Sequence, residues 1–176
     1  MTHCEDLQRI MAKNTKSSAF KARSLGRRLA LQALYQEEMN PSSARNWDLE
    51  LDLYMEEQNE ELGGEERATA LEFAKRLFDG VLFRKREIDD ILNRAFDKRR
   101  TIDRTTIVDR NILRLAAYEI TFVKTPKAVA ISEAMELGKK FGDKNTRAFL
   151  NGVLDQVGKS RENADDATDS DDVSKE

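Results

Sequence analysis

Apolar residues recur along this chain at helical spacing, and little in the sequence interrupts them. From residue 65 to residue 157 they fall at intervals of three and four, which places them on one face of a helix. The 176 residues include only 2 prolines and 8 glycines, the two residues that most weaken a helix interior. No strand pattern competes. The sequence therefore predicts an all-α fold, a compact bundle of six to seven helices without an internal repeat.

Caps, prolines and glycines set the expected helix boundaries. The predicted helices cover residues 21–39, 47–59, 65–84, 87–96, 107–122 and 126–141, with a last helix that follows a cap at Asp143 or Asn145. The helix over 107–122 carries apolar residues on more than one face, so we expect it to be central and buried on several sides.

The two ends of the chain differ in composition from the rest. Residues 1–20 lack sustained periodicity and are basic, which predicts a flexible basic arm. Residues 159–176 are rich in Asp, Ser, Asn and Ala, which predicts a disordered acidic tail. Residues 21–158 then form the folded domain. Within it, Gly152 costs about 1 kcal/mol relative to Ala in a helix interior, so we expect a close helix–helix approach at that position.

The overall net charge of −3 conceals separate blocks of charge. Residues 1–35 carry a net charge of +5 and residues 36–66 a net charge of −10. Such blocks favour different partners for different surfaces, and solvated helix faces explain them equally well.

Several kinds of site are excluded by residue content. The single Cys4 and the single His3 allow neither a disulfide framework nor a Cys/His metal cluster. No glycine-rich phosphate loop and no serine flanked by glycines is present. The neighbours Asp89 and Asp90 do not face each other on a helix. No apolar run approaches the roughly 20 residues of a membrane span, and the N-terminus lacks a signal-peptide core. We expect a soluble, cytoplasmic, non-enzymatic protein without metal or cofactor.

Basic and aromatic residues favour single-stranded RNA as the ligand. Four basic side chains gather at the start of the first predicted helix, beside the basic arm: Lys21, Arg23, Arg27 and Arg28. Arginine grips phosphates and stacks on bases. Tyr35 follows about two turns later, and Phe149 points away from the apolar stripe of the last helix, where a base could stack on it. A solubilising helix start and two aromatics at the edge of the core explain the same residues.

Four segments resemble one known family. They are RRLALQALY at residues 27–35, ILRLAAYEI at 112–120, VAISEAMELGKKFG at 129–142 and FLNGVLD at 149–155. In this order they resemble the NusB family of bacterial transcription antitermination factors, over about residues 21–158. The resemblance implies two packed helical subdomains. It also implies binding to the boxA element in the leader RNA of ribosomal RNA operons.

The resemblance further implies partners and site residues. The small-subunit ribosomal protein that acts as NusE would bind RNA jointly, and NusA, NusG and RNA polymerase would complete the complex that keeps transcription processive. By position, the residues implied for RNA are Arg23, Arg27, Tyr35 and Phe149. Asp109 matches an acidic position on the NusE-facing surface, and Asn145 stands where some members carry an acid that touches the partner. Because Ser24, Leu25 and Gly26 thin the arginine run, Lys21 and the arm lysines can share the RNA contacts.

Two alternatives remain at this point. One is a helical protein-interaction module in which the basic cluster is incidental. The other is the RNA-binding domain of a ribosomal RNA cytosine methyltransferase, which contains a NusB-like domain. The second needs a catalytic domain much larger than the predicted tail, so the length of the chain disfavours it.

Overall fold

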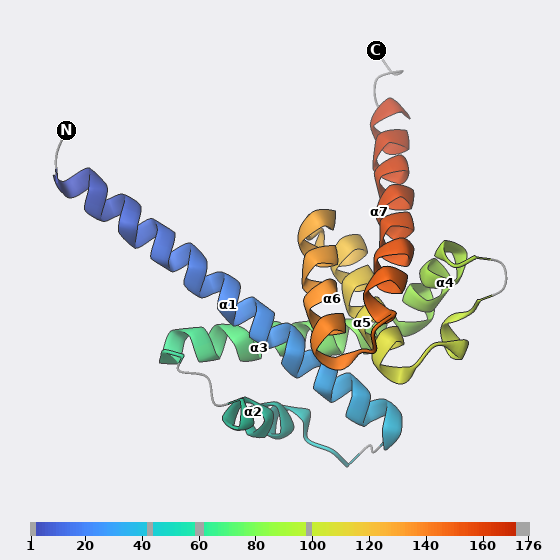
Figure 1. The fold of residues 1–176 in the computed structure, drawn as a ribbon, viewed down its shortest axis with the longest axis horizontal. Helices are drawn as coiled ribbons and strands as arrows, with labels where there is room; N and C mark the ends of the chain where they lie inside the picture. Colours follow the sequence, from blue (N-terminus) through green and yellow to red (C-terminus); the bar gives the residue numbers. More distant parts are fainter. Residues whose placement is uncertain (1–2, 42–43, 59–61, 98–99, 172–176) are drawn as a thin grey trace. The chain divides into compact units, whose positions relative to one another are not determined.

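The computed structural model describes residues 3–41, 44–58, 62–97 and 100–171, and these residues form seven α-helices and no strand. The predicted all-α fold is confirmed. Figure 1 shows the helices, which are α1 (His3–Met39), α2 (Trp47–Glu57), α3 (Gly64–Phe83), α4 (Lys85–Ala95), α5 (Ile107–Tyr118), α6 (Lys127–Phe141) and α7 (Thr146–Asp171). The chain divides into two compact units, a first unit (Met1–Phe78) and a second unit (Asp79–Glu176), with the boundary inside α3.

The core of the first unit forms where the apolar faces of α1, α2 and α3 meet. The buried α1 residues include Leu25 and Leu29, neither of which is exposed to solvent. Gly26 lies between them, and a Cβ atom there would stand 2.7 Å from the carbonyl oxygen of Ala70 and 3.0 Å from the ring of Phe73. Such short distances show that α1 crosses α3 in direct contact at Gly26, where only glycine fits.

The second unit is built around α5. Five apolar residues of this helix are almost fully buried, namely Ile112, Leu113, Leu115, Ala116 and Ala117. The prediction of a central helix buried on several sides is therefore confirmed. Arg114 lies among these residues and donates two hydrogen bonds to the Asp89 carboxylate of α4, at 2.8 and 2.9 Å. This bidentate pair satisfies a buried charge that would otherwise be costly.

Helix α1 begins earlier than the sequence predicts. It starts at His3 rather than near Lys21. Residues 3–20 contain neither Pro nor Gly, and extending an existing helix costs far less than nucleating one. The helix therefore extends on its N-terminal side beyond Lys21, the residue where the amphipathic spacing begins. Residues 1–2 of the predicted arm lie outside the described residues.

Helix α7 also extends further than composition predicts, past Gly158 to Asp171. Two contacts within the second unit hold this extension. The Arg161 guanidinium donates a hydrogen bond of 2.8 Å to the carbonyl of Ile120, and Lys127 forms an ion pair of 3.0 Å with Glu162. These tertiary contacts thus stabilise the part of α7 after Gly158, where the composition alone predicted disorder. Residues 172–176 of the predicted tail lie outside the described residues.

The expected close approach at Gly152 is wrong. Gly152 is exposed, and a Cβ atom built there would meet nothing within 4 Å. The tight glycine of α7 is Gly158 instead, where a Cβ atom would lie 2.0 Å from the Lys127 side chain. A further difference lies at the end of the predicted helix over 107–122, where α5 ends at Tyr118 and a π-helical turn (Glu119–Val123) follows.

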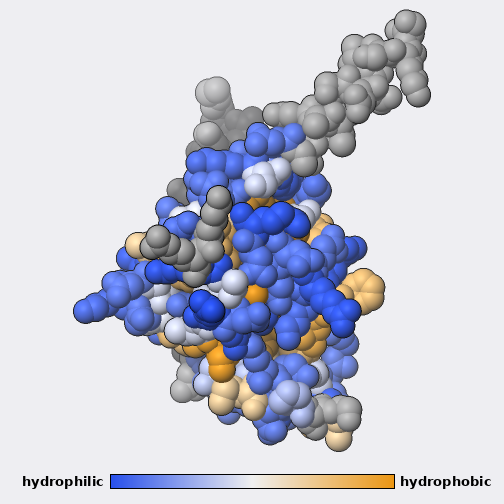
Figure 2. All heavy atoms as spheres, turned by 90° about the vertical axis from the view of Figure 1, so that its right-hand side faces the viewer, coloured by the Kyte–Doolittle hydropathy of each residue, from blue (hydrophilic) through white to orange (hydrophobic). Residues whose placement is uncertain are grey.

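One face of the molecule is shown in Figure 2. Its surface is mostly hydrophilic, and apolar residues come to the surface in small areas between polar ones. Among the described residues, no helix combines the length and apolar character that a membrane span requires.

Candidate nucleic-acid interface

Five of the residues predicted to bind RNA lie on α1 in the first unit, and the helix separates them into two faces. Lys21, Arg28 and Tyr35 are seven residues apart, so at about 100° per residue they share one face. Arg23 and Arg27 are four residues apart and share another face. Lys21 and Arg23 are exposed, whereas Arg28 and Tyr35 are half-buried. The basic cluster seen in the sequence is therefore not one patch but two edges of the same helix.

The Arg23–Arg27 face is directed toward α3. The guanidinium carbon of Arg27 lies 5.1 Å from the centroid of the Phe73 ring, and that of Arg23 lies 5.9 Å from it. Arg27 is only 4% exposed and makes further contacts inside the fold. The guanidinium group of Arg27 is therefore buried inside the protein, whereas Arg23 is exposed to solvent.

Lys21 lies near a carboxylate of α3. Glu66 accepts hydrogen bonds from the Ser18 hydroxyl and from the Gly63 N–H. The Ser18 hydrogen bond and then the Gly63 hydrogen bond hold the pKa of Glu66 below its usual value, and the charge of Lys21 contributes less. The positive charge of Lys21 is therefore partly offset by the ionised Glu66.

The remaining RNA candidate, Phe149, lies in the first turn of α7 in the second unit. Its half-buried ring stacks on the ring of Phe96, with centroids 5.9 Å apart and planes only 5° from parallel. The guanidinium carbon of Arg100 lies 5.2 Å from the Phe149 centroid. This arrangement fixes the ring while leaving part of it open to solvent.

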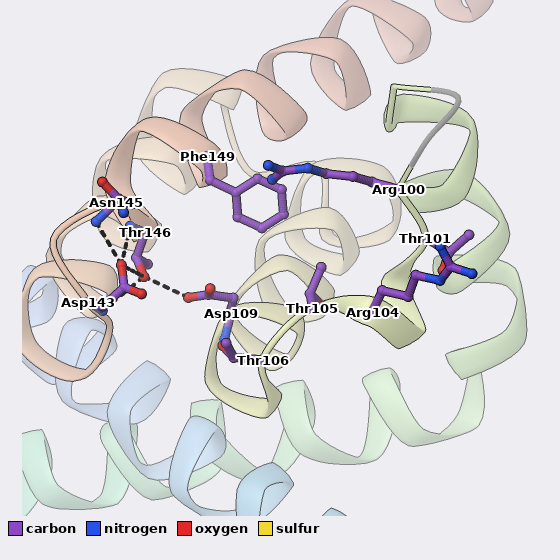
Figure 3. Close-up of a pocket in the computed structure, with 10 residues that line it drawn as sticks. All are labelled: Arg100, Thr101, Arg104, Thr105, Thr106, Asp109, Asp143, Asn145, Thr146 and Phe149. Atoms are coloured by element: carbon purple, nitrogen blue, oxygen red, sulfur yellow. Dashed lines mark hydrogen bonds between the residues drawn. The ribbon is translucent and has the colours of Figure 1, made fainter.

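Phe149 borders a pocket of about 420 Å³. The pocket is lined by ten residues of the second unit, namely Arg100, Thr101, Arg104, Thr105, Thr106, Asp109, Asp143, Asn145, Thr146 and Phe149. Figure 3 shows the Arg100 side chain reaching over the Phe149 ring, with Asp109 and Thr146 directed toward each other beside them. The fold thus brings Asp109, Asn145 and Phe149 to one pocket, although they are widely spaced in sequence.

Asp109 has a structural partner within this pocket. Its side chain accepts a hydrogen bond of 2.9 Å from the Thr146 hydroxyl, and it is only 8% exposed. Its backbone N–H donates to the Thr106 hydroxyl, which caps α5. Asp109 therefore ties the start of α5 to the start of α7. Asn145 is exposed at the same pocket.

The structure also shows which of the two predicted residues, Asp143 or Asn145, caps α7. The Asp143 carboxylate accepts hydrogen bonds from the backbone N–H groups of Asn145 (2.7 Å) and Thr146 (3.1 Å). Asp143, rather than Asn145, therefore satisfies the first free N–H of the helix. In the part of the chain that the structure describes, no group of three or more His, Cys, Asp and Glu residues could hold a metal ion.

Comparison with known proteins decides the family. The model of the NusB family matches residues 24–159. The chain belongs to the NusB family. The transcription antitermination protein NusB of Elusimicrobium minutum is 38% identical over 143 residues, which cover 80% of this chain and 96% of that protein. The NusB protein of Geobacter sulfurreducens is 42% identical over 137 residues, covering 77% of this chain and 93% of that protein.

Solved NusB structures share the fold. A structure of T. maritima NusB has a TM-score of 0.63 and 34% identity, and the match covers 78% of this chain and 90% of that one. A second match comes from a crystal structure of the antitermination factors NusB and NusE in complex with double-stranded RNA. It has a TM-score of 0.64 and 29% identity, and the match covers 80% of this chain and 98% of that one. The predicted family and the transcription antitermination function are therefore confirmed.

The NusB match includes most of the predicted site but starts at Ser24, after Lys21 and Arg23. Sequence reasoning missed Arg100, which lies over the Phe149 ring, and Arg76, which lies over the Phe73 ring. The basic run at 98–100, just before an expected cap, was the available signal for Arg100. Arg76 had a weaker signal, its position one helical turn after Phe73.

Proposed function

We propose that this NusB-family chain binds the boxA element of ribosomal RNA leader transcripts jointly with the ribosomal protein that acts as NusE. In this proposal it joins NusA, NusG and RNA polymerase in the cytoplasm and keeps transcription processive. The observation that carries the proposal is the half-buried Phe149 ring, which stacks on Phe96, lies 5.2 Å from the Arg100 guanidinium carbon and borders a polar pocket that includes four threonines.

The chemistry of this pocket suits an unpaired base. A half-buried aromatic ring offers a stacking surface worth about 1–3 kcal/mol per base. The Thr101 hydroxyl can donate to or accept from a base edge, and Arg104 can bind a phosphate. The Thr105 hydroxyl donates to the Ile102 carbonyl and can still accept, and the Thr106 hydroxyl, which caps α5, can still donate. Because a base inside a duplex is already stacked, this arrangement favours single-stranded RNA. Lys21, Arg23 and Arg28 of the first unit add affinity for the phosphate backbone, and the buried Arg27 adds positive charge beneath the surface.

Asp109 and Asn145 are the residues that we propose for the NusE-type partner. Both lie at the pocket that Phe149 borders, so protein and RNA would be bound at neighbouring positions of the second unit. The crystal structure of the antitermination factors NusB and NusE in complex with double-stranded RNA supports the pairing of a protein partner with an RNA. The proposal requires no catalytic residue and no cofactor, since recognition and assembly suffice for antitermination.

The test is a titration of the full chain, alone and with the NusE-type ribosomal protein. The ligands are a boxA RNA, a scrambled RNA of the same composition, and the boxA RNA annealed to its complement. We expect at least about tenfold tighter binding to single-stranded boxA than to either control, and tighter binding with the partner present. Equal affinity for the boxA and scrambled RNAs would contradict the proposed specificity.

A further inference from the structure

Three arginines converge on one ring in the first unit. The guanidinium carbons of Arg23, Arg27 and Arg76 lie 5.9, 5.1 and 5.2 Å from the centroid of Phe73, which is itself only 7% exposed. Arg76 belongs to α3, outside the arginine-containing segment of α1. Two helices therefore contribute positive charge to the same small region.

The helix crossing explains this convergence. Helix α1 contacts α3 at Gly26, where a Cβ atom would lie 3.0 Å from Phe73. Arg23 and Arg27 stand three residues before and one residue after Gly26, so both emerge beside the crossing. Arg76 follows Phe73 by one helical turn and emerges on the same side of α3 as the ring. Because α1 and α3 cross with no room for a side chain at Gly26, all three arginines lie close to the same ring.

The charges at this crossing are incompletely balanced by the protein. Within the described ranges, neither Arg23 nor Arg76 forms an ion pair, and both are exposed. Arg27 is buried with contacts of its own. The α3 carboxylate of Glu66 is engaged by Ser18 and the Gly63 N–H. Arg23 and Arg76 thus present two positive charges beside one ring, so an added anion would stabilise the cluster.

We propose that Arg23 and Arg76, held against Phe73 and backed by Arg27, form a clamp for an RNA phosphate. An aromatic contact restricts a guanidinium without consuming its N–H donors, which match phosphate oxygens in a bidentate geometry. The inference rests on the proposed RNA-binding function and extends it to α3. It also compensates for the thinned arginine run of α1, because Arg76 supplies from α3 a charge that Ser24, Leu25 and Gly26 do not.

The experiment measures the affinity of the full chain for boxA and scrambled RNA over a series of salt concentrations. For Arg76→Ala we expect binding about five- to tenfold weaker at low salt, by the same factor for both RNAs. The slope of log affinity against log salt should fall by about 0.7 in magnitude, and the double variant with Arg23→Ala should lose about 1.4. Arg76→Lys keeps the charge but not the fork, so it should retain the slope and lose part of the affinity.

Arg86→Ala is the matched control, since Arg86 is an exposed arginine of α4 without an aromatic contact and its removal changes the net charge equally. An unchanged slope for Arg76→Ala, or an equal change for Arg86→Ala, would overturn the clamp. So would a loss of affinity for the NusE-type protein with RNA binding intact, which would make the cluster a site for an acidic protein segment.

The wild-type chain separates the two proposals. Equal wild-type affinity for both RNAs contradicts the boxA proposal, while the change in slope still tests the clamp. A wild-type chain that binds neither RNA overturns both.

Discussion

The arginine cluster of the first unit and the Phe149 pocket of the second unit both place an exposed arginine beside a phenylalanine, and they differ in the exposure of the ring. In the cluster, the ring of Phe73 is buried and the guanidinium groups of Arg23 and Arg76 meet solvent. In the pocket, the charge of Asp109 is buried in a hydrogen bond, and the ring of Phe149 is partly open. The cluster therefore suits phosphates, and the pocket suits a base. An arginine beside a phenylalanine does not define a function until the exposure of each is known.

This difference has a measurable signature. Phosphate contacts release counterions, so their contribution to affinity falls as salt rises. Stacking on an aromatic ring depends little on salt. Variants of the two regions should therefore separate in their salt dependence.

The largest expected effect concerns Asp109 and the scaffold of the pocket. Asp109→Ala removes a buried acceptor and leaves the Thr146 hydroxyl with Asp143 alone, whose carboxylate oxygen lies 3.4 Å away. We expect the free energy of unfolding to fall by about 2–3 kcal/mol in urea titrations. Thr146→Val should cost at least as much, because it also removes the acceptor of the Asp143 N–H, and the double variant should cost little more than Thr146→Val.

Asp103→Ala is the control, since Asp103 is exposed and lies six residues before Asp109. It should leave stability nearly unchanged. Unaltered stability of Asp109→Ala would show that the hydrogen bond from Thr146 to Asp109 does not hold the pocket together, whatever the affinity of the variant for the NusE-type protein.

Phe149→Ala has the next largest expected effect. Losing one stacked base should weaken boxA binding by about 2 kcal/mol, or roughly thirtyfold. The salt slope should stay unchanged, because no charge is removed. Phe83→Ala serves as the control, since Phe83 is an aromatic of the second unit that is 87% exposed and lies outside the pocket. A parallel loss in both variants would show that the effect is not specific to the pocket.

A smaller effect is expected for Lys21, on the other face of α1 from Arg23. Lys21→Ala should weaken RNA binding by about twofold and change the salt slope by less than Arg23→Ala does. The reason is the ionised Glu66, whose lowered pKa reflects in part the nearby charge of Lys21. Equal slope changes for the two variants would indicate that RNA follows both faces of α1.

The last prediction is a gain in stability rather than a loss of binding. Gly152→Ala should raise the free energy of unfolding by about 0.5–1 kcal/mol, because an added methyl group meets open space and alanine favours a helix. Ala148→Gly, at an exposed position of the same helix, should lower it by a similar amount. Thermal melts of both variants measure this difference. Destabilisation by Gly152→Ala would mean that the glycine is needed for a contact inside the protein.

Local sequence patterns predicted the elements of this fold better than their ends. The central, buried α5 followed from apolar residues on several faces. The extension of α7 did not, because it depends on contacts of Arg161 with Ile120 and of Glu162 with Lys127, which are distant in sequence. Gly152 was misjudged because a helix glycine has the same local cost whether or not a neighbour lies close.

The candidate site was predictable only in part. The angular position of Phe149 on its helix placed it at the flank of the core, and the structure has it half-buried. The burial of Arg27 against Phe73 and the approach of Arg76 arise from the crossing of α1 and α3. No property of either helix alone determines where helices cross. The resemblance to the NusB family supplied the proposed RNA ligand, and the structure supplied the geometry of the residues proposed to bind it.

Transcription read-through is the most direct test of the central claim. RNA polymerase with NusA, NusG and the NusE-type protein would transcribe past a terminator from two templates, one with a boxA leader and one with a scrambled leader. We expect the wild-type chain to raise read-through on the boxA template alone, and both Phe149→Ala and Arg76→Ala to reduce that gain. Equal read-through on the two templates with the wild-type chain would contradict the account.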